Sequence, residues 1–289
     1  MKKFCCLTLL LFLLTTPVLA HPHYYRGYHG GSNVYLIKRD YDEVQTSFSN
    51  CAHFKLLSKT TRDYYSNGAR NTYTFYTILN SDGSVFESNI LDVKHVIHNN
   101  EHYFIINRGK GYVILNEKGE QLSKKTYSKI TQITPNRLLV RYEKLFGIID
   151  LNENIIVPIK YKKMEQISQK IFLTKLNGYF GMLNLENELL IKNEYEKIER
   201  LYDTFILKKY GKYGLCDTNG KIILDAKYDK IKKLGEYILI KQDGKYGVFY
   251  SNGVKITDIC YKKIELKRNT LQGKDTHGKW VEIQSQSVL

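Results

Sequence analysis

An aromatic residue followed by glycine recurs along this sequence at a nearly constant interval. Successive glycines of these pairs lie 34, 33 and 33 residues apart, and a tyrosine stands 14 residues after each glycine. A fixed period of this length, with matching positions inside it, predicts a repeat protein in which each unit packs on its neighbours. The pairs and their tyrosines are Phe146-Gly147 with Tyr161, Phe180-Gly181 with Tyr195, Tyr213-Gly214 with Tyr228, and Tyr246-Gly247 with Tyr261.

Residues 212–231 (KYGLCDTNGKIILDAKYDKI) show one unit most clearly. Two apolar segments flank Asn219-Gly220, a pair that adopts the positive φ angles of a two-residue hairpin turn, so we expect them to pair as antiparallel strands. After Tyr228 we expect a short polar turn and then a third strand, for example residues 237–240. Helical spacing is absent, which predicts an all-β fold.

Weaker copies extend the period in both directions, so we expect about six to seven three-stranded antiparallel units. The sequence opens with a strand near residues 34–41 and closes with one near 280–283. Pairing of these two strands would close a propeller-like ring, which we favour, and the alternative is an open β-solenoid. Residues 60–71 interrupt the pattern and are predicted to form an inserted surface hairpin or loop.

The repeated aromatics and tyrosines occupy one equivalent position in every unit, which favours core packing over ligand binding. Truncation of a buried one, such as Tyr228→Ala, would cost roughly 3–5 kcal/mol.

The motif Gly-Lys-aromatic-Gly, Asp-x-Asn-Gly, Lys-Tyr-Asp-x-Ile resembles the bacterial WG-repeat (KWG) family. Residues 212–231 and 245–264 match it best, and Tyr or Phe replaces the Trp everywhere except at Trp280, which Val281 follows. The resemblance covers essentially all of residues 21–289 and implies an all-β repeat domain. It also implies a binding role in an envelope or surface context, and it implies neither an enzyme activity nor a cofactor.

The first 20 residues are typical of a secretory signal peptide: two lysines, an apolar run over residues 4–14, and small or apolar residues up to Ala20. The run is shorter than the roughly 20 residues of a spanning helix. We therefore expect an exported mature chain, residues 21–289, in the periplasm or outside the cell. We also expect it not to span a membrane.

The mature chain is strongly basic. Loss of Lys2 and Lys3 with the leader leaves 42 of the 44 basic residues against 29 acidic ones, a net charge of +13. Such a charge favours an anionic envelope polymer or another protein as partner. Only nine of the basic residues are Arg, the residue preferred for base and phosphate recognition, so we expect no specific nucleic acid.

In several units, lysines follow the tyrosine that stands 14 residues after the glycine (the phased tyrosine). These lysines form a candidate basic stripe. The alternative is that this polar turn is simply solvated. The candidate residues are Lys162, Lys163, Lys197, Lys230, Lys232, Lys233, Lys262 and Lys263.

The segment His98-Asn99-Asn100-Glu101-His102 matches the HxxEH pattern of inverted zinc proteases. That chemistry needs a helix, whereas Asn99-Asn100 favours a turn, so we predict no catalytic residue, no bound metal and no enzyme activity. A metal-dependent hydrolase near His98 and His102 remains an alternative, as do adventitious metal binding with His95 and a purely structural envelope role.

Two further groups of residues have simple interpretations. His21, His23 and His29 are expected in a polar segment at the start of the mature chain. The three cysteines of the mature chain, an odd number, are expected as separate and mostly buried thiols.

Overall fold

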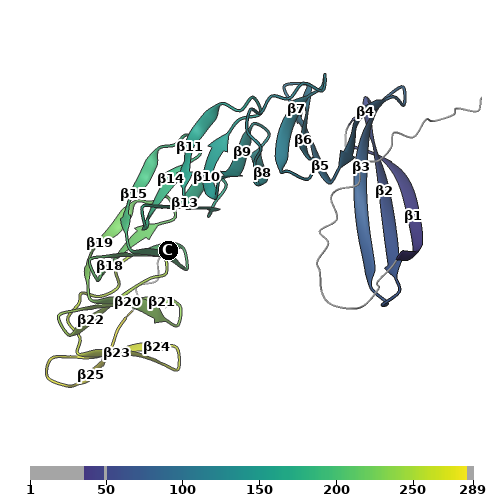
Figure 1. Cartoon of the computed structure of the whole chain (residues 1–289). Helices are drawn as coiled ribbons and strands as arrows, with labels where there is room; N and C mark the ends of the chain where they lie inside the picture. Colours follow the sequence, from purple (N-terminus) through teal and green to yellow (C-terminus); the bar gives the residue numbers. More distant parts are fainter. Residues whose placement is uncertain (1–35, 49–50, 285–289) are drawn as a thin grey trace, which may run out of the picture. The chain divides into compact units, whose positions relative to one another are not determined.

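The computed structural model describes residues 36–48 and 51–284. Within them the chain forms 25 strands and no helix (Figure 1). The strands are β1 (Leu36–Ser47), β2 (Phe54–Tyr65), β3 (Arg70–Asn80), β4 (Val85–Ile90), β5 (Asp92–His98), β6 (Glu101–Asn107), β7 (Tyr112–Asn116), β8 (Lys129–Thr134), β9 (Arg137–Tyr142), β10 (Leu145–Ile149), β11 (Ile155–Tyr161), β12 (Lys163–Gln166), β13 (Ile171–Leu176), β14 (Tyr179–Asn184), β15 (Leu189–Tyr195), β16 (Lys197–Leu201), β17 (Thr204–Lys209), β18 (Lys212–Asp217), β19 (Ile222–Tyr228), β20 (Lys230–Leu234), β21 (Tyr237–Gln242), β22 (Lys245–Phe249), β23 (Lys263–Lys267), β24 (Thr270–Lys274) and β25 (Trp280–Glu282).

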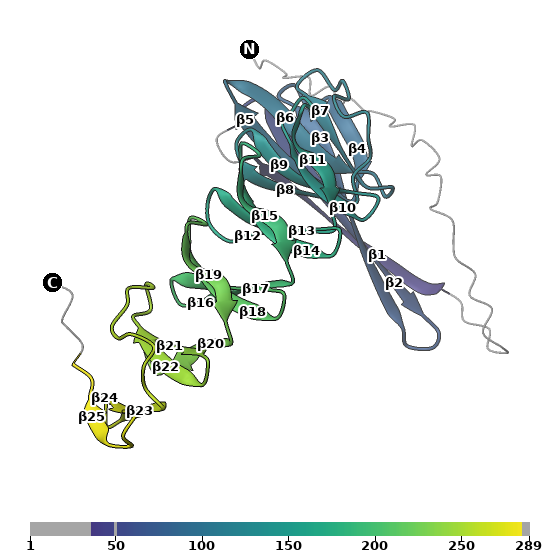
Figure 2. The ribbon, with the colours of Figure 1, turned by 90° about the vertical axis from the view of Figure 1, so that its left-hand side faces the viewer.

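The strands form seven small antiparallel sheets of three or four strands each. The sheet orders are β1-β2-β3-β4, β5-β6-β7, β11-β10-β9-β8, β12-β13-β14-β15, β16-β17-β18-β19, β20-β21-β22 and β23-β24-β25. Figure 2 shows the later sheets following one another in chain order. The all-β repeat prediction is therefore confirmed.

The array is open. Within the described residues, β1 pairs only with β2, and β25 pairs only with β24, so no sheet combines the two ends of the array. Of the two arrangements that the sequence left open, this strand pairing fits the open array, since no described sheet closes a ring.

The 14-residue spacing between the glycine of each aromatic-Gly pair and the tyrosine that follows it results from the register of a hairpin. Tyr213 of β18 lies directly opposite Tyr228 of β19. The equivalent residues are opposite each other in the other units as well: Phe146 with Tyr161, Phe180 with Tyr195, Tyr112 with Tyr127, and Tyr246 with Tyr261. Such cross-strand aromatic pairs stabilise the hairpins of these five units.

The glycine of the pair is required by a close approach of the backbone. The register between β18 and β19 shifts around Gly214, which places a bulge of β19 over it. A Cβ atom on Gly214 would lie 2.6 Å from the carbonyl oxygen of Leu224. The same 2.6 Å approach occurs between Gly147 and Val157, and between Gly181 and Ile191.

The turn between β18 and β19 differs from the expected two-residue turn. Asp217 and Lys221 close a three-residue loop, in which Gly220 has a positive φ of 83° and Asn219 does not. The Asp217 carboxylate accepts hydrogen bonds from the backbone N–H groups of Asn219 and Lys221 at 2.9 and 2.8 Å. The side chain that precedes the loop therefore fixes it. Two-residue turns with two positive φ angles occur instead before the aromatic-Gly pair, as at Tyr210-Gly211.

The segment after the phased tyrosine is also different from the prediction. Residues 230–234 form the strand β20, which pairs with β21 in the following sheet, whereas the sequence indicated a short polar turn. The equivalent segments form the edge strands β12, β16 and β23, and in each of these four strands the second residue is buried.

The core lies between consecutive sheets. Ile231, Ile238 and Ile240 pack with Leu215 and Tyr228 of the preceding sheet. On the other face of the same sheet, Tyr237, Leu239 and Val248 pack with Ile264 and Leu271 of the following one. This sheet therefore buries both faces, and the repeat is stabilised by packing between neighbouring sheets.

Residues 60–71 lie at the ends of β2 and β3 and in the turn between them. In this segment the N–H of Tyr65 donates to the carbonyl of Ala69 at 2.9 Å, and Gly68 has a positive φ of 81°. The insert is thus a hairpin extension of two strands.

Candidate functional site

The lysines of the predicted basic stripe lie on or next to edge strands. β12, β16, β20 and β23 each begin with one of these lysines, and each is the outermost strand of its own sheet. The residue after that lysine is buried in all four strands: Met164, Ile198, Ile231 and Ile264. This buried residue anchors the strand and leaves the lysine directed to solvent.

All eight candidate lysines are exposed. Six of them belong to the four edge strands, and Lys162 and Lys262 stand immediately before β12 and β23. The Lys262 ammonium group donates a hydrogen bond to the carbonyl of Thr276 at 2.6 Å. The first lysine of the edge strand therefore recurs at one equivalent position in four of the described sheets.

Their charges are not equally available, because three of the four edge strands carry a glutamate two residues after the first lysine. Lys163 pairs with Glu165, and Lys197 pairs with Glu199, both at 2.6 Å. Glu265 lies between Lys263 and Lys267 and pairs with both. On these strands a glutamate therefore offsets part of the lysine charge.

The strand β20 has Lys232 where the other strands have glutamate. Lys230, Lys232 and Lys233 have no carboxylate partner among the residues that the structure describes. The Lys233 ammonium group lies 4.9 Å from the centre of the Tyr202 ring, and Lys230 lies opposite Lys241 of β21. We call Lys230, Lys232 and Lys233 the β20 lysine cluster.

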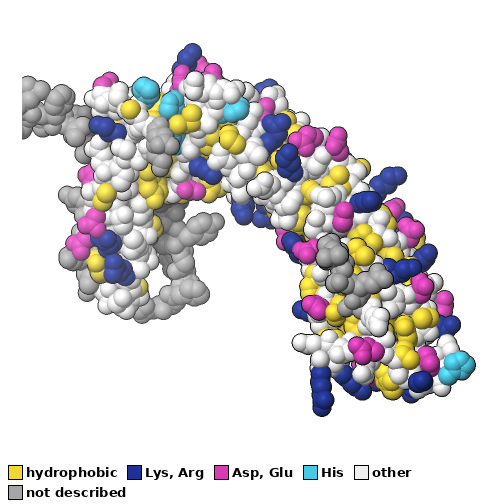
Figure 3. Space-filling view, turned by 180° about the vertical axis from the view of Figure 1, so that it is seen from behind, with side chains coloured by type: hydrophobic (Ala, Val, Ile, Leu, Met, Phe, Trp, Pro, Cys, Tyr) yellow, Lys and Arg dark blue, Asp and Glu magenta, His cyan; other side chains and the backbone are white. Residues whose placement is uncertain are grey.

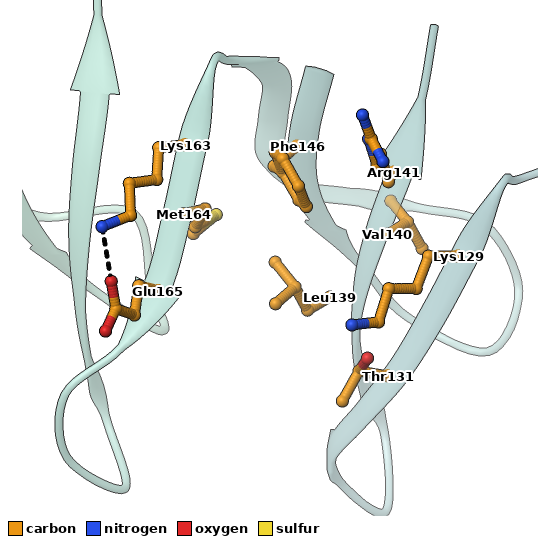
Figure 4. Close-up of a pocket in the computed structure, with 9 residues that line it drawn as sticks. All are labelled: Lys129, Thr131, Leu139, Val140, Arg141, Phe146, Lys163, Met164 and Glu165. Atoms are coloured by element: carbon orange, nitrogen blue, oxygen red, sulfur yellow. Dashed lines mark ion pairs between the residues drawn. The ribbon is translucent and has the colours of Figure 1, made fainter. Parts of the chain in front are cut away.

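A cleft between two consecutive sheets is lined by equivalent lysines of both sheets. It has a volume of about 310 Å³, and Lys129 of β8 and Lys163 of β12 line it from opposite sides (Figure 4). Arg141 adds a third cation, and its guanidinium lies 5.5 Å from the centre of the Phe146 ring. Glu165 also lines the cleft and pairs with Lys163, so the cleft is only weakly basic.

Other charges dilute the stripe as a whole. Figure 3 shows Lys and Arg side chains mixed with Asp and Glu side chains over one face. Lysine on an edge strand also has a structural use, since it prevents an open sheet edge from pairing with another chain. The uncompensated charge of β20 is therefore the part of the stripe that stands out.

The hydrolase alternative depended on His98 and His102. In the β5–β6 register, His98 lies opposite Glu101, and His102 lies opposite Ile97. Because neighbouring residues of a strand point to opposite faces, His98 and His102 lie on opposite faces of the sheet. Asn99 and Asn100 have φ angles of 52° and 63° and form the turn between the strands. The two imidazoles therefore cannot bind one ion as the HxxEH pattern requires.

His102 lies next to a different histidine. His95 and His102 are diagonal neighbours on one face of the β5–β6 hairpin, and His95 Nε2 lies 2.8 Å from His102 Nδ1. The Cys51 thiol, from the segment before β2, lies 3.7 Å from His102 Nδ1. Sequence reasoning had included His95 and His102 in an adventitious site but had not connected Cys51 to them. We call Cys51, His95 and His102 the Cys-His cluster.

Burial keeps His95 neutral. Desolvation, with the neighbouring His102, lowers the pKa of His95 from its ordinary 6.5 to about 4. At neutral pH the imidazole therefore retains a lone pair on one ring nitrogen.

The described cysteines are free thiols. Cys216 is buried, Cys51 is half-buried and Cys260 is exposed, so the expectation of mostly buried thiols is wrong for Cys260. Burial raises the pKa of the Cys216 thiol to about 12, which makes it unreactive.

The signal peptide and the residues His21, His23 and His29 lie outside the described residues, and their predictions stay predictions. The described residues contain no helix of the length and apolarity needed to cross a membrane.

These observations define the class of protein: an all-β repeat array of small antiparallel sheets. Two segments, residues 146–180 and 213–246, match the family model of the WG containing repeat. Each segment starts at the aromatic of one aromatic-Gly pair and ends at the aromatic of the next. The chain therefore contains WG-type repeats, and the resemblance noted in the sequence is confirmed for these two units.

Among curated proteins, no match to this chain was found. Similar solved structures include the AfRom2 CNH domain, with 10% identity, coverage of 86% of this chain and 98% of that chain, and a TM-score of 0.29. Kluyveromyces lactis Hsv2 has 11% identity, coverage of 80% and 96%, and a TM-score of 0.30. The extracellular domain of the putative hybrid two component system BT4673 from B. thetaiotaomicron has 12% identity, coverage of 68% and 32%, and a TM-score of 0.23. At such scores these likenesses carry no inference about function.

Proposed function

We propose that this chain is an exported, non-enzymatic binding module that holds an anionic polymer of the cell envelope through its lysine-bearing edge strands. The β20 lysine cluster is the centre of this surface. The observation that carries the proposal is the contrast between β20 and its equivalents: the third residue is Lys232 in β20 and glutamate in β12, β16 and β23. Protection of the sheet edge needs lysine on all four strands but does not need the loss of glutamate on one of them.

The neighbourhood of β20 also suits a polymer of negative charges. Lys230 lies opposite Lys241, and the first lysines of β12, β16 and β23 likewise lie opposite a lysine, but only β20 has no glutamate beside this pair of like charges. Such an arrangement is unfavourable in the free chain and is relieved when an anion lies between the two ammonium groups. A polymer with repeated anionic groups can contact several of these lysines at once and gains affinity from each released counterion.

The test compares two variants with the same change in charge. One carries K230E, K232E and K233E. The matched control carries K163E, K197E and K263E, where each lysine already has a glutamate partner. Binding of the mature chain to immobilised dextran sulfate and to lipopolysaccharide is measured over a range of salt concentrations.

We expect the β20 variant to lose most of its affinity. The number of counterions released on binding, obtained from the slope of log affinity against log salt concentration, should fall by about two to three. The control should retain most of the affinity, since its lysines are already neutralised. Equal losses in both variants would mean that only net charge matters, and salt-independent binding would contradict the charge mechanism. Circular dichroism and gel filtration establish that both variants remain folded and monodisperse.

A further inference from the structure

The Cys-His cluster combines the three side chains whose donor atoms bind transition metals most readily. The ligating atoms of Cys51, His95 and His102 all lie within 4.8 Å of one another, and all three residues are half-buried. They come from three separate segments: the residues before β2, the strand β5 and the strand β6. Only the fold brings them together.

The distances are close to those of a tetrahedral site. Zinc bonds of about 2.0–2.1 Å to nitrogen and 2.3 Å to sulfur place two nitrogens ~3.3 Å apart and a nitrogen and a sulfur ~3.6 Å apart. Cys51 Sγ and His102 Nδ1 are already 3.7 Å apart. His95 Nε2 and His102 Nδ1 are 2.8 Å apart and share one proton, so an ion between them needs a separation only about 0.5 Å larger.

Aromatic side chains surround the two imidazoles. The ring of Phe48 lies 4.9 Å from that of His95, and Phe54 lies 5.6 Å from His102. Phe104 is fully buried and stacks on His95 at 5.1 Å. This apolar shell restricts water and fixes the ring planes, which favours a preorganised metal site over two solvated histidines.

We propose that Cys51, His95 and His102 bind one transition metal ion of borderline softness, of the Zn²⁺ or copper type, and leave a fourth position open. A thiolate with two imidazoles selects such ions over Mg²⁺ and Ca²⁺, which require oxygen ligands. On binding, the Cys51 thiol releases its proton to solvent. The proton between the two imidazoles moves to a ring nitrogen that does not face the ion.

The ion would have a structural consequence. Cys51 precedes β2 of the first sheet, whereas His95 and His102 belong to the second sheet. A metal ion would therefore join these two sheets by coordinate bonds and reinforce the side-chain packing of Phe54 against Phe104. The exposed His53 also lies nearby, with its ring 5.6 Å from that of His102.

The first experiment is a titration of the metal-free mature chain with Co²⁺, followed by absorption spectroscopy. Cobalt reports a thiolate ligand by a charge-transfer band and a tetrahedral site by its visible bands. We expect one such site per chain, its loss in Cys51→Ser, and a decrease in affinity of at least about tenfold in His95→Ala and His102→Ala. His98→Ala and Cys260→Ser are matched controls, since His98 lies on the opposite face and Cys260 is an exposed thiol elsewhere; both should retain the band.

The second experiment needs no variant and so does not depend on the folding of one. The mature chain is alkylated with iodoacetamide, and the modification of each cysteine is measured by mass spectrometry. Zn²⁺ and Cu⁺ should protect Cys51 and leave Cys260 reactive, whereas Mg²⁺ and Ca²⁺ should protect neither. Displacement of Co²⁺ by Zn²⁺ or Cu⁺ ranks the two ions. Absence of the charge-transfer band from the wild type, its survival in Cys51→Ser, or equal reactivity of Cys51 with and without Zn²⁺ would overturn the proposal.

Discussion

The glycine of the aromatic-Gly pair gives the sharpest test of how the sequence specifies the repeat. In Gly214→Ala the new Cβ atom would lie 2.6 Å from the Leu224 carbonyl oxygen, where ordinary contacts begin at 3.4 Å. It would also lie 2.9 Å from the Ala226 nitrogen and 3.0 Å from the Asp225 carbonyl carbon. All three are backbone atoms, so no side-chain rotation relieves the contact, and β19 must move by up to 0.8 Å, the difference between 3.4 and 2.6 Å.

The expected cost follows from two opposing effects. Overpacking of this kind destabilises by roughly 1–3 kcal/mol, and the upper end applies because a hairpin backbone has to move. Alanine also restricts the unfolded chain, which returns about 0.4–1 kcal/mol. We therefore expect Gly214→Ala to lower the free energy of unfolding of this hairpin by about 2 kcal/mol.

The control is Gly211→Asn in the neighbouring turn. Gly211 has a positive φ of 71°, but an added Cβ there meets no atom within 4 Å, and asparagine tolerates this conformation. Its cost should stay below about 1 kcal/mol. The measurements are urea unfolding and hydrogen exchange of β18–β19 peptides, with β10–β11 peptides as a reference in the same chain. If Gly214→Ala costs less than Gly211→Asn, the close approach does not explain the glycine.

Two further predictions concern a buried ring and a titrating histidine. Tyr161→Ala should destabilise the chain by about 3–5 kcal/mol in urea unfolding, because Tyr161 is only 2% exposed. The control, Tyr179→Ala, should have a small effect because Tyr179 is 49% exposed. Equal destabilisation by the two substitutions would contradict the packing role of Tyr161. The pKa of His95 is about 4 in the folded chain, against an ordinary value of 6.5. Between these pH values the unfolded chain binds more protons than the folded chain, so stability falls as the pH falls. The free energy of unfolding of the metal-free chain should therefore decrease by about 1–2 kcal/mol from about pH 6.5 to about pH 4, after allowance for partial exposure. His95→Gln should weaken this pH dependence of stability. If the urea midpoint of the variant falls as steeply with decreasing pH as that of the wild type, groups other than His95 cause the loss of stability.

Much of the fold could be predicted because the repeat puts the same local information in every unit. Fourteen residues from Gly214 to Tyr228 determine a hairpin register, and the same spacing appears four times in the sequence. The predicted turn after Tyr228 was wrong for a physical reason. Lys230, Lys232 and Lys233 make residues 230–234 read as polar, and only the adjacent sheet shows that Ile231 is buried and that the segment is a strand.

The candidate sites differ in how far the sequence could reach them. The lysines were visible because they recur after the tyrosine of successive units, but their ion pairs with Glu165 and Glu199 were not predicted. The Cys-His cluster had no local signal for Cys51, which is 44 residues from His95 and 51 from His102. A pair of histidines seven residues apart around an Asn-Asn turn could have indicated that His95 and His102 share a face of a hairpin.

The sequence by itself determined the repeat: its period, its all-β character and the aromatic, glycine and tyrosine positions that build each hairpin. These depend on contacts between residues close in the chain, and local contacts are encoded by spacing. The tertiary structure alone decided that no described sheet joins the two ends of the array, which lysines have a carboxylate partner, and that Cys51 lies beside two histidines. Those outcomes depend on how sheets far apart in sequence stack and pair, and no single unit contains that information.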